Sequence, residues 1–100
     1  MGAKSIDDDR IHGATADTNN LPPQYPPGAG ARGEHGIVGV RLHVDELGLV
    51  TRVDIVQSSG FPRLDRAAQV ALRAWHFKAA ERDGHAVPDL IEINVSFELQ

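Results

Sequence analysis

The stretch from Ile91 to Leu99 constrains the fold more than any other part of this 100-residue chain. Its apolar and polar side chains alternate without a break, which is typical of a β-strand with one face on a core and one in water. Because only Gln100 follows, we expect this strand to lie at a sheet edge, open to another chain's strand. The expected inward residues are Ile91, Ile93, Val95, Phe97 and Leu99, and the outward ones are Glu92, Asn94, Ser96 and Glu98.

The composition is that of a small soluble domain. Apolar residues make up 41% and charged residues 24% of the chain, which is ordinary for one globular unit. The net charge of -4 disfavours a nucleic-acid partner, because such proteins usually carry a basic face. The absence of cysteine excludes a disulfide framework and a thiolate metal site. No apolar run approaches the ~18 residues of a membrane span.

Residues 1–21 are expected to form a flexible tail, because they hold few large apolar side chains to offset the entropy of ordering. We interpret Met1 as the start of a fragment whose upstream sequence is missing. Leu21–Pro27 has four prolines in seven residues, which favours a stiff, polyproline-like path. This Pro-rich leader opens a domain predicted over residues 22–100, and Tyr25 is expected to anchor it on the body.

Gly28–Gly33 spells the G-x-G-x-x-G pattern of dinucleotide-binding sites. That fingerprint needs a preceding strand and a following helix, whereas here prolines precede it and a strand-like segment follows. We therefore expect a short, frayed helical turn, since each glycine lowers helix stability by up to ~1 kcal/mol.

A hairpin and one helix are expected before the closing strand. Ile37–Asp45 and Leu49–Ser58 alternate around a turn at Asp45–Gly48, which is typical of a β-hairpin. Val50 is out of step with this alternation, which indicates a bulge or an early end to the strand pairing. Pro62 suits the first turn of a helix of about four turns. The residues expected to face the sheet from this helix are Leu64, Ala68, Ala71, Leu72 and Trp75.

The predicted fold class is α+β, with elements in the order β-β-α-β. We expect a three-stranded antiparallel sheet with strand order 2-1-3, one main helix packed on one face, and the short N-terminal helix beside it. The strand order 1-2-3 remains an alternative. Both orders leave the closing strand at an edge of the sheet.

No arrangement of residues indicates catalysis or metal binding. The five histidines fall on different expected elements, without the spacing that places two metal ligands on one face. Ser58–Gly60 lacks the G-x-S-x-G surround of a nucleophile elbow and is typical of a turn. We predict no catalytic residue, no metal site and no cofactor, and we expect that the protein is not an enzyme.

A set of short motifs, in this order and spacing, resembles the C-terminal domain of the TonB energy-transducing family. Each motif alone is weakly specific, but together they cover roughly three quarters of the chain. Ala79 stands where the family commonly has proline, so the helical region is expected to run further or to end less sharply. The motifs are Pro23-Gln24-Tyr25-Pro26, Ala29, Gly36, Asp45-Glu46-Leu47-Gly48-Leu49-Val50, Val53-Asp54-Ile55-Val56-Gln57-Ser58-Ser59-Gly60, Leu64-Asp65-Arg66-Ala67-Ala68, Trp75-His76-Phe77 and Val95-Ser96-Phe97-Glu98-Leu99.

The resemblance implies a periplasmic adaptor whose full-length parent is anchored in the inner membrane of a Gram-negative bacterium. In this family, the N-terminal region that is missing here joins the ExbB and ExbD motor, and a Pro-rich linker spans the periplasm. The C-terminal domain grips the TonB box, a short extended segment of an outer-membrane transporter for siderophores, haem or other nutrients. Residues 1–21 would then be the end of the linker.

The residue pattern and the resemblance lead to one hypothesis, in which the TonB box adds a strand to the closing strand. Backbone groups would supply most of the binding, and outward polar side chains would tune selectivity. The same free edge allows an edge-paired homodimer as well as a monomer, and peptidoglycan is a further candidate partner. The expected partner-binding residues are Ile91, Glu92, Ile93, Asn94, Val95, Ser96, Phe97, Glu98 and Leu99, together with Pro23, Gln24 and Tyr25 of the leader.

Two other classes of function stay open at this point. One is a structural or peptidoglycan-binding envelope module of TonB/TolA-like type, without a role in transport. The other is a small hydrolase that uses the open face of the sheet.

Overall fold

The structure is a computed structural model that describes residues 11–99. Residues 1–10, which make up the first half of the expected tail, and Gln100 lie outside the described residues.

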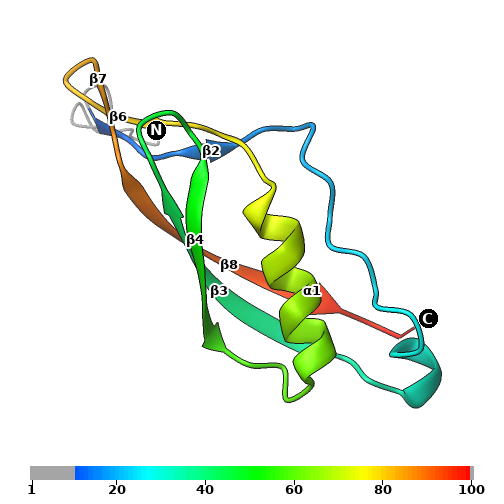
Figure 1. The fold of residues 1–100 in the computed structure, drawn as a ribbon. Coiled ribbons are helices and arrows are strands. Elements are labelled where there is room, and N and C mark those ends of the chain that lie inside the picture. Colours follow the sequence, from blue (N-terminus) through cyan, green and yellow to red (C-terminus); the bar gives the residue numbers. More distant parts are fainter. Residues whose placement is uncertain (1–10, 100) are drawn as a thin grey trace, which may run out of the picture.

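The main sheet is antiparallel and has three strands. β3 (Gly36–Val44) lies in the centre, with β4 (Val50–Gln57) on one side and β8 (Asp89–Phe97) on the other. This arrangement corresponds to the order 2-1-3 of the expected strands. The helix α1 (Pro62–Arg73) covers one face of the sheet (Figure 1). The α+β fold class predicted from the sequence is confirmed.

Several short strands extend the fold beyond the main sheet. β6 (Ala80–Arg82) lies between β1 (Ile11–His12) and β7 (His85–Val87), and β2 (Thr15–Ala16) pairs with β5 (Phe77–Lys78). These strands were not predicted from the sequence. Segments of two or three residues are too short to show a period of two, so alternation carries no signal for them.

Residues 11–21 differ from the flexible tail that the composition suggested. Besides the strand pairs of β1 and β2, the Asn20 side chain donates to the His76 carbonyl and accepts from the His76 N–H, both at 2.8 Å. The Trp75 indole donates to the Leu21 carbonyl at 2.8 Å. These bonds need no large apolar side chains, which explains why composition gave no sign of them. The domain boundary expected after residue 21 stays a prediction.

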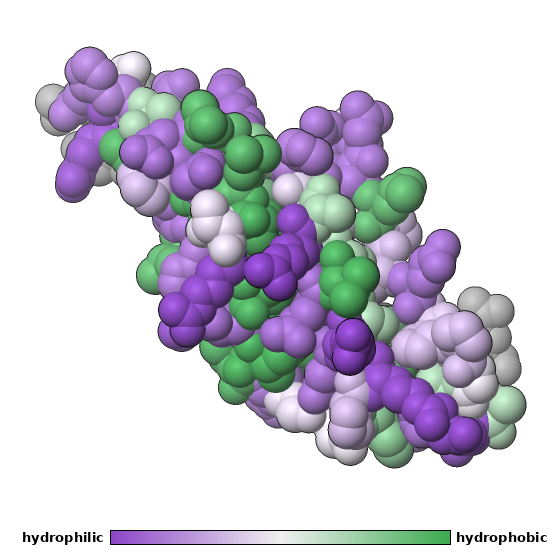
Figure 2. Space-filling model, in the orientation of Figure 1, coloured by the Kyte–Doolittle hydropathy of each residue, from purple (hydrophilic) through white to green (hydrophobic). Residues whose placement is uncertain are grey.

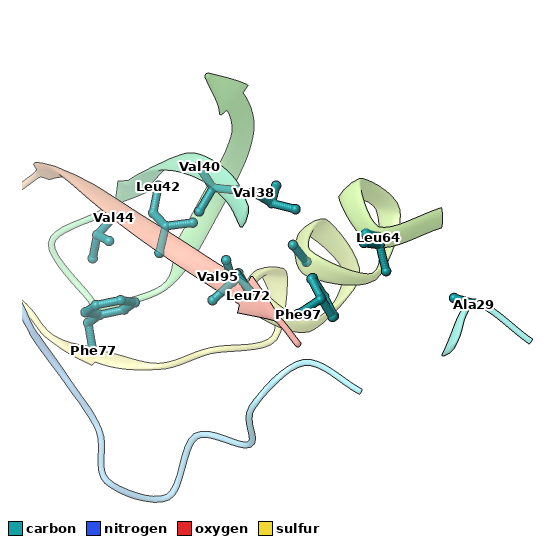
Figure 3. Close-up of a cluster of buried hydrophobic side chains, with 11 residues drawn as sticks. Ala29, Val38, Val40, Leu42, Val44, Leu64, Leu72, Phe77, Val95 and Phe97 are labelled. Carbon is teal, nitrogen blue, oxygen red and sulfur yellow. The ribbon is translucent and has the colours of Figure 1, made fainter. Parts of the chain in front are cut away.

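The core lies between α1, the sheet and the segments that flank them (Figure 3). The alternation along β3 and β8 sends one set of side chains into it, and the helical repeat of α1 supplies the opposite wall. Each large side chain buried there contributes roughly 1.5–3 kcal/mol to the free energy of folding. The buried cluster consists of Ala29, Val38, Val40, Leu42, Val44, Leu64, Ala68, Leu72, Phe77, Val95 and Phe97.

The helix α1 is shorter than the sequence suggested. α1 has 12 residues and ends at Arg73, so Trp75 lies beyond the helix and not in its last turn. The substitution of proline by Ala79 does not extend α1, because the chain has already left the helix. The expected N-terminal helix is the single 3-10 turn η2 (Gly30–Arg32), which Gly33 ends with a φ of 74°.

The turn between β3 and β4 requires glycine. Asp45 Oδ1 accepts the backbone N–H groups of Leu47 and Leu49, both at 2.9 Å. Gly48 has a φ of +82°, and a Cβ placed there would lie 1.9 Å from the Phe77 carbonyl oxygen. The register of the hairpin shifts between His43 and Val44, and Val50 still pairs with Val44. Of the two expected irregularities, the structure therefore has the bulge and not an early end to the pairing.

Candidate functional site

β8 pairs with β3 along its whole length without a break in register. The pairs run from Gly36 opposite Phe97 to Val44 opposite Asp89. No other strand among residues 11–99 pairs with β8, so its second side is an open edge of the main sheet (Figure 1).

The backbone groups at this open edge belong to even-numbered residues. Thr51 Oγ1 donates to the His43 carbonyl at 3.2 Å, so this carbonyl points from β3 toward β4. Backbone groups alternate sides along a strand, so the odd-numbered residues of β3 bond to β4 and the even-numbered ones bond to β8. In the β3–β8 register, the partners of these even-numbered residues are odd-numbered, as in Val40 opposite Ile93. The N–H and C=O groups of Glu92, Asn94 and Ser96 therefore point away from the sheet.

At the beginning of β8 one outward donor is already used. The Leu90 N–H donates to Asp89 Oδ1 at 2.9 Å. The other oxygen of this carboxylate accepts the Ala14 N–H at 3.1 Å, which ties β8 to the segment between β1 and β2. The edge that remains for a guest strand therefore begins after Leu90.

The side chains of β8 alternate as predicted from Ile91 to Phe97. Val95 and Phe97 are buried, and the outward side chains of Glu92, Asn94 and Ser96 are exposed. The strand itself runs two residues further at its start and ends at Phe97.

The residues beyond Phe97 do not continue the pattern. Leu99 is 46% exposed, so the expectation that it packs on the core is wrong. The chain leaves the sheet after Phe97, and Glu98 accepts a hydrogen bond from the Ser96 hydroxyl at 3.1 Å.

The polar side chains beside the edge lie on the sheet face opposite α1. Arg41 of β3 holds Glu92 through its Nε and Nη2 atoms, at 3.1 and 2.7 Å from the same carboxylate oxygen. Asn94 lies opposite Gly39, where a Cβ would come within 3.3 Å of its Oδ1 atom. The missing side chain at Gly39 thus leaves room for Asn94 on this face.

Tyr25 packs on the body of the domain, as predicted, and its contact there is with the end of β8. Its ring meets Phe97 edge-on, with centroids 5.6 Å apart and planes at 82°. Its hydroxyl donates to the Glu34 carbonyl. Gln24 instead lines a groove between the leader and α1, and Pro23 is half-buried. Of the three leader residues proposed from the sequence, Tyr25 is the one with a contact to β8 in the structure.

A charged cluster that the sequence analysis missed joins β3 and β4. His43 Nε2 lies 2.9 Å from one oxygen of Asp54, and Arg52 Nε donates to the other at 2.7 Å. The hydrogen bonds from His43 and then from Arg52 lower the pKa of Asp54 below its ordinary value. The cluster could have been predicted from the register of the hairpin. This register pairs His43 with Arg52 and places Asp54 in the next pair on the same face of the sheet.

Asp65 ties the first turn of α1 to the segment after β4. It accepts hydrogen bonds from the Ser59 N–H at 2.9 Å, from the Ser59 hydroxyl at 2.8 Å and from the Ser58 hydroxyl. Burial raises the pKa of Asp65, but these hydrogen bonds outweigh it, so the net pKa is lowered. Ser58 and Ser59 therefore have a structural role in the turn that leads into α1.

Between residues 11 and 99, no three His, Asp or Glu side chains gather closely enough to hold a metal ion. In the same range, no helix is long and apolar enough to cross a membrane.

Comparison with known proteins identifies relatives that all carry the name TonB. The family described as Gram-negative bacterial TonB protein C-terminal matches residues 22–99. Protein TonB of Xanthomonas campestris pv. campestris is 40% identical over 81 residues, covering 81% of this chain and 36% of that protein. Protein tonB2 of Pseudomonas aeruginosa is 35% identical over 81 residues, covering 81% of this chain and 30% of that protein. The chain therefore spans about a third of the length of these relatives.

A solved structure shares the fold. The solution NMR structure of the Pseudomonas aeruginosa TonB CTD matches with a TM-score of 0.71 and 25% sequence identity. The match covers 97% of this chain and 94% of that chain.

Proposed function

The chain belongs to the TonB C-terminal family of Gram-negative bacteria, and from this premise we propose that it is the receptor-binding end of a periplasmic energy-transducing adaptor. A TonB-box segment of an outer-membrane transporter for siderophores, haem or other nutrients adds a strand to β8. The parent protein, anchored in the inner membrane, joins ExbB and ExbD through its upstream region. This role needs no catalytic residue and no cofactor.

The observation that supports strand addition is the regular open edge of β8. Glu92, Asn94 and Ser96 present donors and acceptors in one line, next to an unbroken ladder with β3. Each hydrogen bond to a guest strand contributes a net ~0.5–1.5 kcal/mol. Because the backbone is alike whatever the side chains, such a site accepts segments of different sequence.

The same geometry suits the transfer of force. A pull along the axis of two paired strands loads their hydrogen bonds together. The leader is attached to β8 through Tyr25 and Phe97, so tension from upstream reaches the strand that holds the guest.

Asn94→Pro, with Asn94→Ala as its matched control, tests the proposal. The Asn94 N–H points outward, so proline removes a donor for the guest while the ladder to β3 keeps all its donors. We expect the proline variant to bind a synthetic TonB-box peptide at least roughly tenfold more weakly, which corresponds to ~1.4 kcal/mol. The alanine variant keeps the N–H and should bind like the unchanged protein. Isothermal titration calorimetry measures both.

The fold of each variant is checked by its ¹⁵N–¹H correlation spectrum. If both variants stay folded and bind the peptide equally well, strand addition at β8 is wrong. Amide shifts produced by muropeptides, with none produced by the TonB-box peptide, would instead support a peptidoglycan-binding module. Sedimentation over a concentration series distinguishes a monomer from an edge-paired homodimer.

A further inference from the structure

A groove runs between the Pro-rich leader and α1, away from the open edge of β8. Its volume is about 530 Å³. Small side chains of α1 and the indole of Trp75 form much of its lining, and Leu21 and Gln24 of the leader border it. The hydrogen bond from the Trp75 indole to the Leu21 carbonyl, at 2.8 Å, fixes the two walls relative to each other.

Two large apolar side chains on this groove are unusually open to solvent. Leu21 is 79% and Val70 is 63% exposed, and both line the groove. A single exposed apolar residue is ordinary, but Leu21 and Val70 share one hollow with alanines and a tryptophan. Polar residues, Asp17 and Asn19 among them, complete the lining. The apolar part of this hollow matches one large apolar side chain of a partner.

The crest of α1 beside the groove carries three arginines. Arg63, Arg66, Val70 and Arg73 follow the helical spacing that places residues on one face. All three arginines are exposed, and none forms an ion pair with another residue between 11 and 99. Figure 2 shows an apolar patch flanked by strongly hydrophilic surface over α1.

Arg63 and Arg66 are not explained by the stability of the helix, whereas Arg73 lies in the last turn, where the helix dipole favours a positive charge. Arg63 is the second residue of α1, where the helix dipole disfavours a positive charge by a few tenths of a kcal/mol, roughly. Arg63 and Arg66 are neighbours on the helix surface and repel each other. The chain has a net charge of -4, so a basic crest does not follow from a basic composition.

We propose that the groove and the arginine crest together bind an acidic, extended segment of a partner protein that carries a large apolar side chain. The apolar side chain enters the groove between Leu21 and Val70. Carboxylates on either side of it pair with Arg66 and Arg73, whose Cα atoms are about 10 Å apart along the helix axis.

A recessed groove favours a peptide over a flat surface. The apolar lining lies between the leader and the helix, so a planar bilayer does not reach it. This second surface does not use the outward backbone groups of β8, so it is independent of strand addition.

The test uses a blocked synthetic peptide of sequence Asp-Glu-Leu-Phe-Asp-Glu and a control in which every acidic residue is lysine. We expect the acidic peptide to shift the amide signals of Ala67–Ala74 and the indole signal of Trp75. We expect Arg66→Gln combined with Arg73→Gln to weaken this binding at least tenfold, or ~1.4 kcal/mol. Val70→Ser should weaken it several-fold.

Arg32→Gln combined with Arg82→Gln is the matched control, because it removes two exposed arginines elsewhere and should leave the affinity unchanged. Binding of a TonB-box peptide should stay the same in both double variants, which separates this proposal from the proposed function.

The proposal is overturned if the acidic peptide causes no shifts on α1, or shifts only at β8. Equal binding of the lysine peptide also overturns it. Two further outcomes overturn the proposal if the acidic peptide causes no response. One is binding of the protein to phosphatidylglycerol vesicles. The other is self-association that is lost in the Arg66/Arg73 double variant.

Discussion

The two edges of the main sheet are built differently. β8 keeps one register with β3 over its full length, whereas β4 shifts its register with β3 twice. On the outer side of β4, Gln69 of α1 donates to the Val53 carbonyl at 3.3 Å. One outward acceptor of β4 is therefore already in use, while the outward groups of β8 at Glu92, Asn94 and Ser96 face no described strand.

This difference indicates which edge is available to a guest. Proteins protect sheet edges with bulges and with covering elements, because a flat, regular edge pairs with other chains. β4 has two bulges and a helix that reaches its outer side. β8 has a regular ladder, and no strand among residues 11–99 pairs with its outer side, so strand addition is expected at β8 and not at β4.

The largest expected effect comes from Phe97→Ala. Phe97 is 4% exposed and packs against Tyr25, so its loss should lower the free energy of unfolding by roughly 3–5 kcal/mol. Val53→Ala on β4 is the matched control and should cost about half as much, since Val53 is smaller and only half-buried. Urea unfolding measures both. A smaller loss for Phe97→Ala than for Val53→Ala would show that β8 is not the better anchored edge strand.

Asp65→Asn tests the connection between β4 and α1. We expect a loss of about 1–2 kcal/mol, reduced by the partial exposure of the carboxylate. The pKa of Asp65 is lower in the folded protein than its ordinary value of 3.8. Its contribution is therefore fully present above that value and is lost as the pH falls through the lower folded value.

The measurement is urea unfolding from about pH 5 to about pH 2, where the unchanged protein should lose more stability than Asp65→Asn. Glu46→Gln, at an exposed position, serves as the control. Parallel pH curves for the unchanged protein and Asp65→Asn would contradict the prediction.

Gln69→Glu removes the amide donor that covers the β4 edge while keeping the shape of the side chain. We expect a loss of about 1 kcal/mol, the net value of one hydrogen bond. Thermal unfolding measures the change, and Gln24→Glu is a control at an exposed position on the leader. Stability equal to that of the unchanged protein would show that α1 does not protect β4 through this bond.

The smallest effect is expected at the surface pair beside β8. The side chains of Arg41 and Glu92 are 42% and 61% exposed, so Glu92→Gln should change stability by less than about 0.5 kcal/mol. A double-mutant cycle with Arg41→Gln, at low and high salt, isolates the pair. A coupling above about 1 kcal/mol would mean that this ion pair holds β8 in place.

The faces of the strands and the helix were predictable because the cause is local. Alternation along β3 and β8 decided which side chains are buried, and the helical repeat placed Leu64, Ala68 and Leu72 on the sheet. The ends of the elements were less predictable. Leu99 continues the pattern in the sequence, but the chain has left the sheet by then, and the position of that exit depends on the partner strand.

The candidate site was predictable in part. The sequence indicated that β8 is an edge strand and that Tyr25 anchors the leader. It gave no sign that Gln69 donates a hydrogen bond at the other edge. Nor did it indicate that Asn20 bonds to His76, or Trp75 to Leu21. These contacts join residues far apart in the chain and leave no periodic trace.

By itself, the sequence determined the three strands of the main sheet and the helix α1, their buried faces and the family of this protein, because periodicity and short motifs act over a few residues. Only the tertiary structure decided which backbone groups of β8 point outward and why β4 is the closed edge. Side-chain direction follows from residue parity within one strand. The direction of backbone groups in the sheet depends in addition on which strands become neighbours, and that is set by pairing across the whole chain.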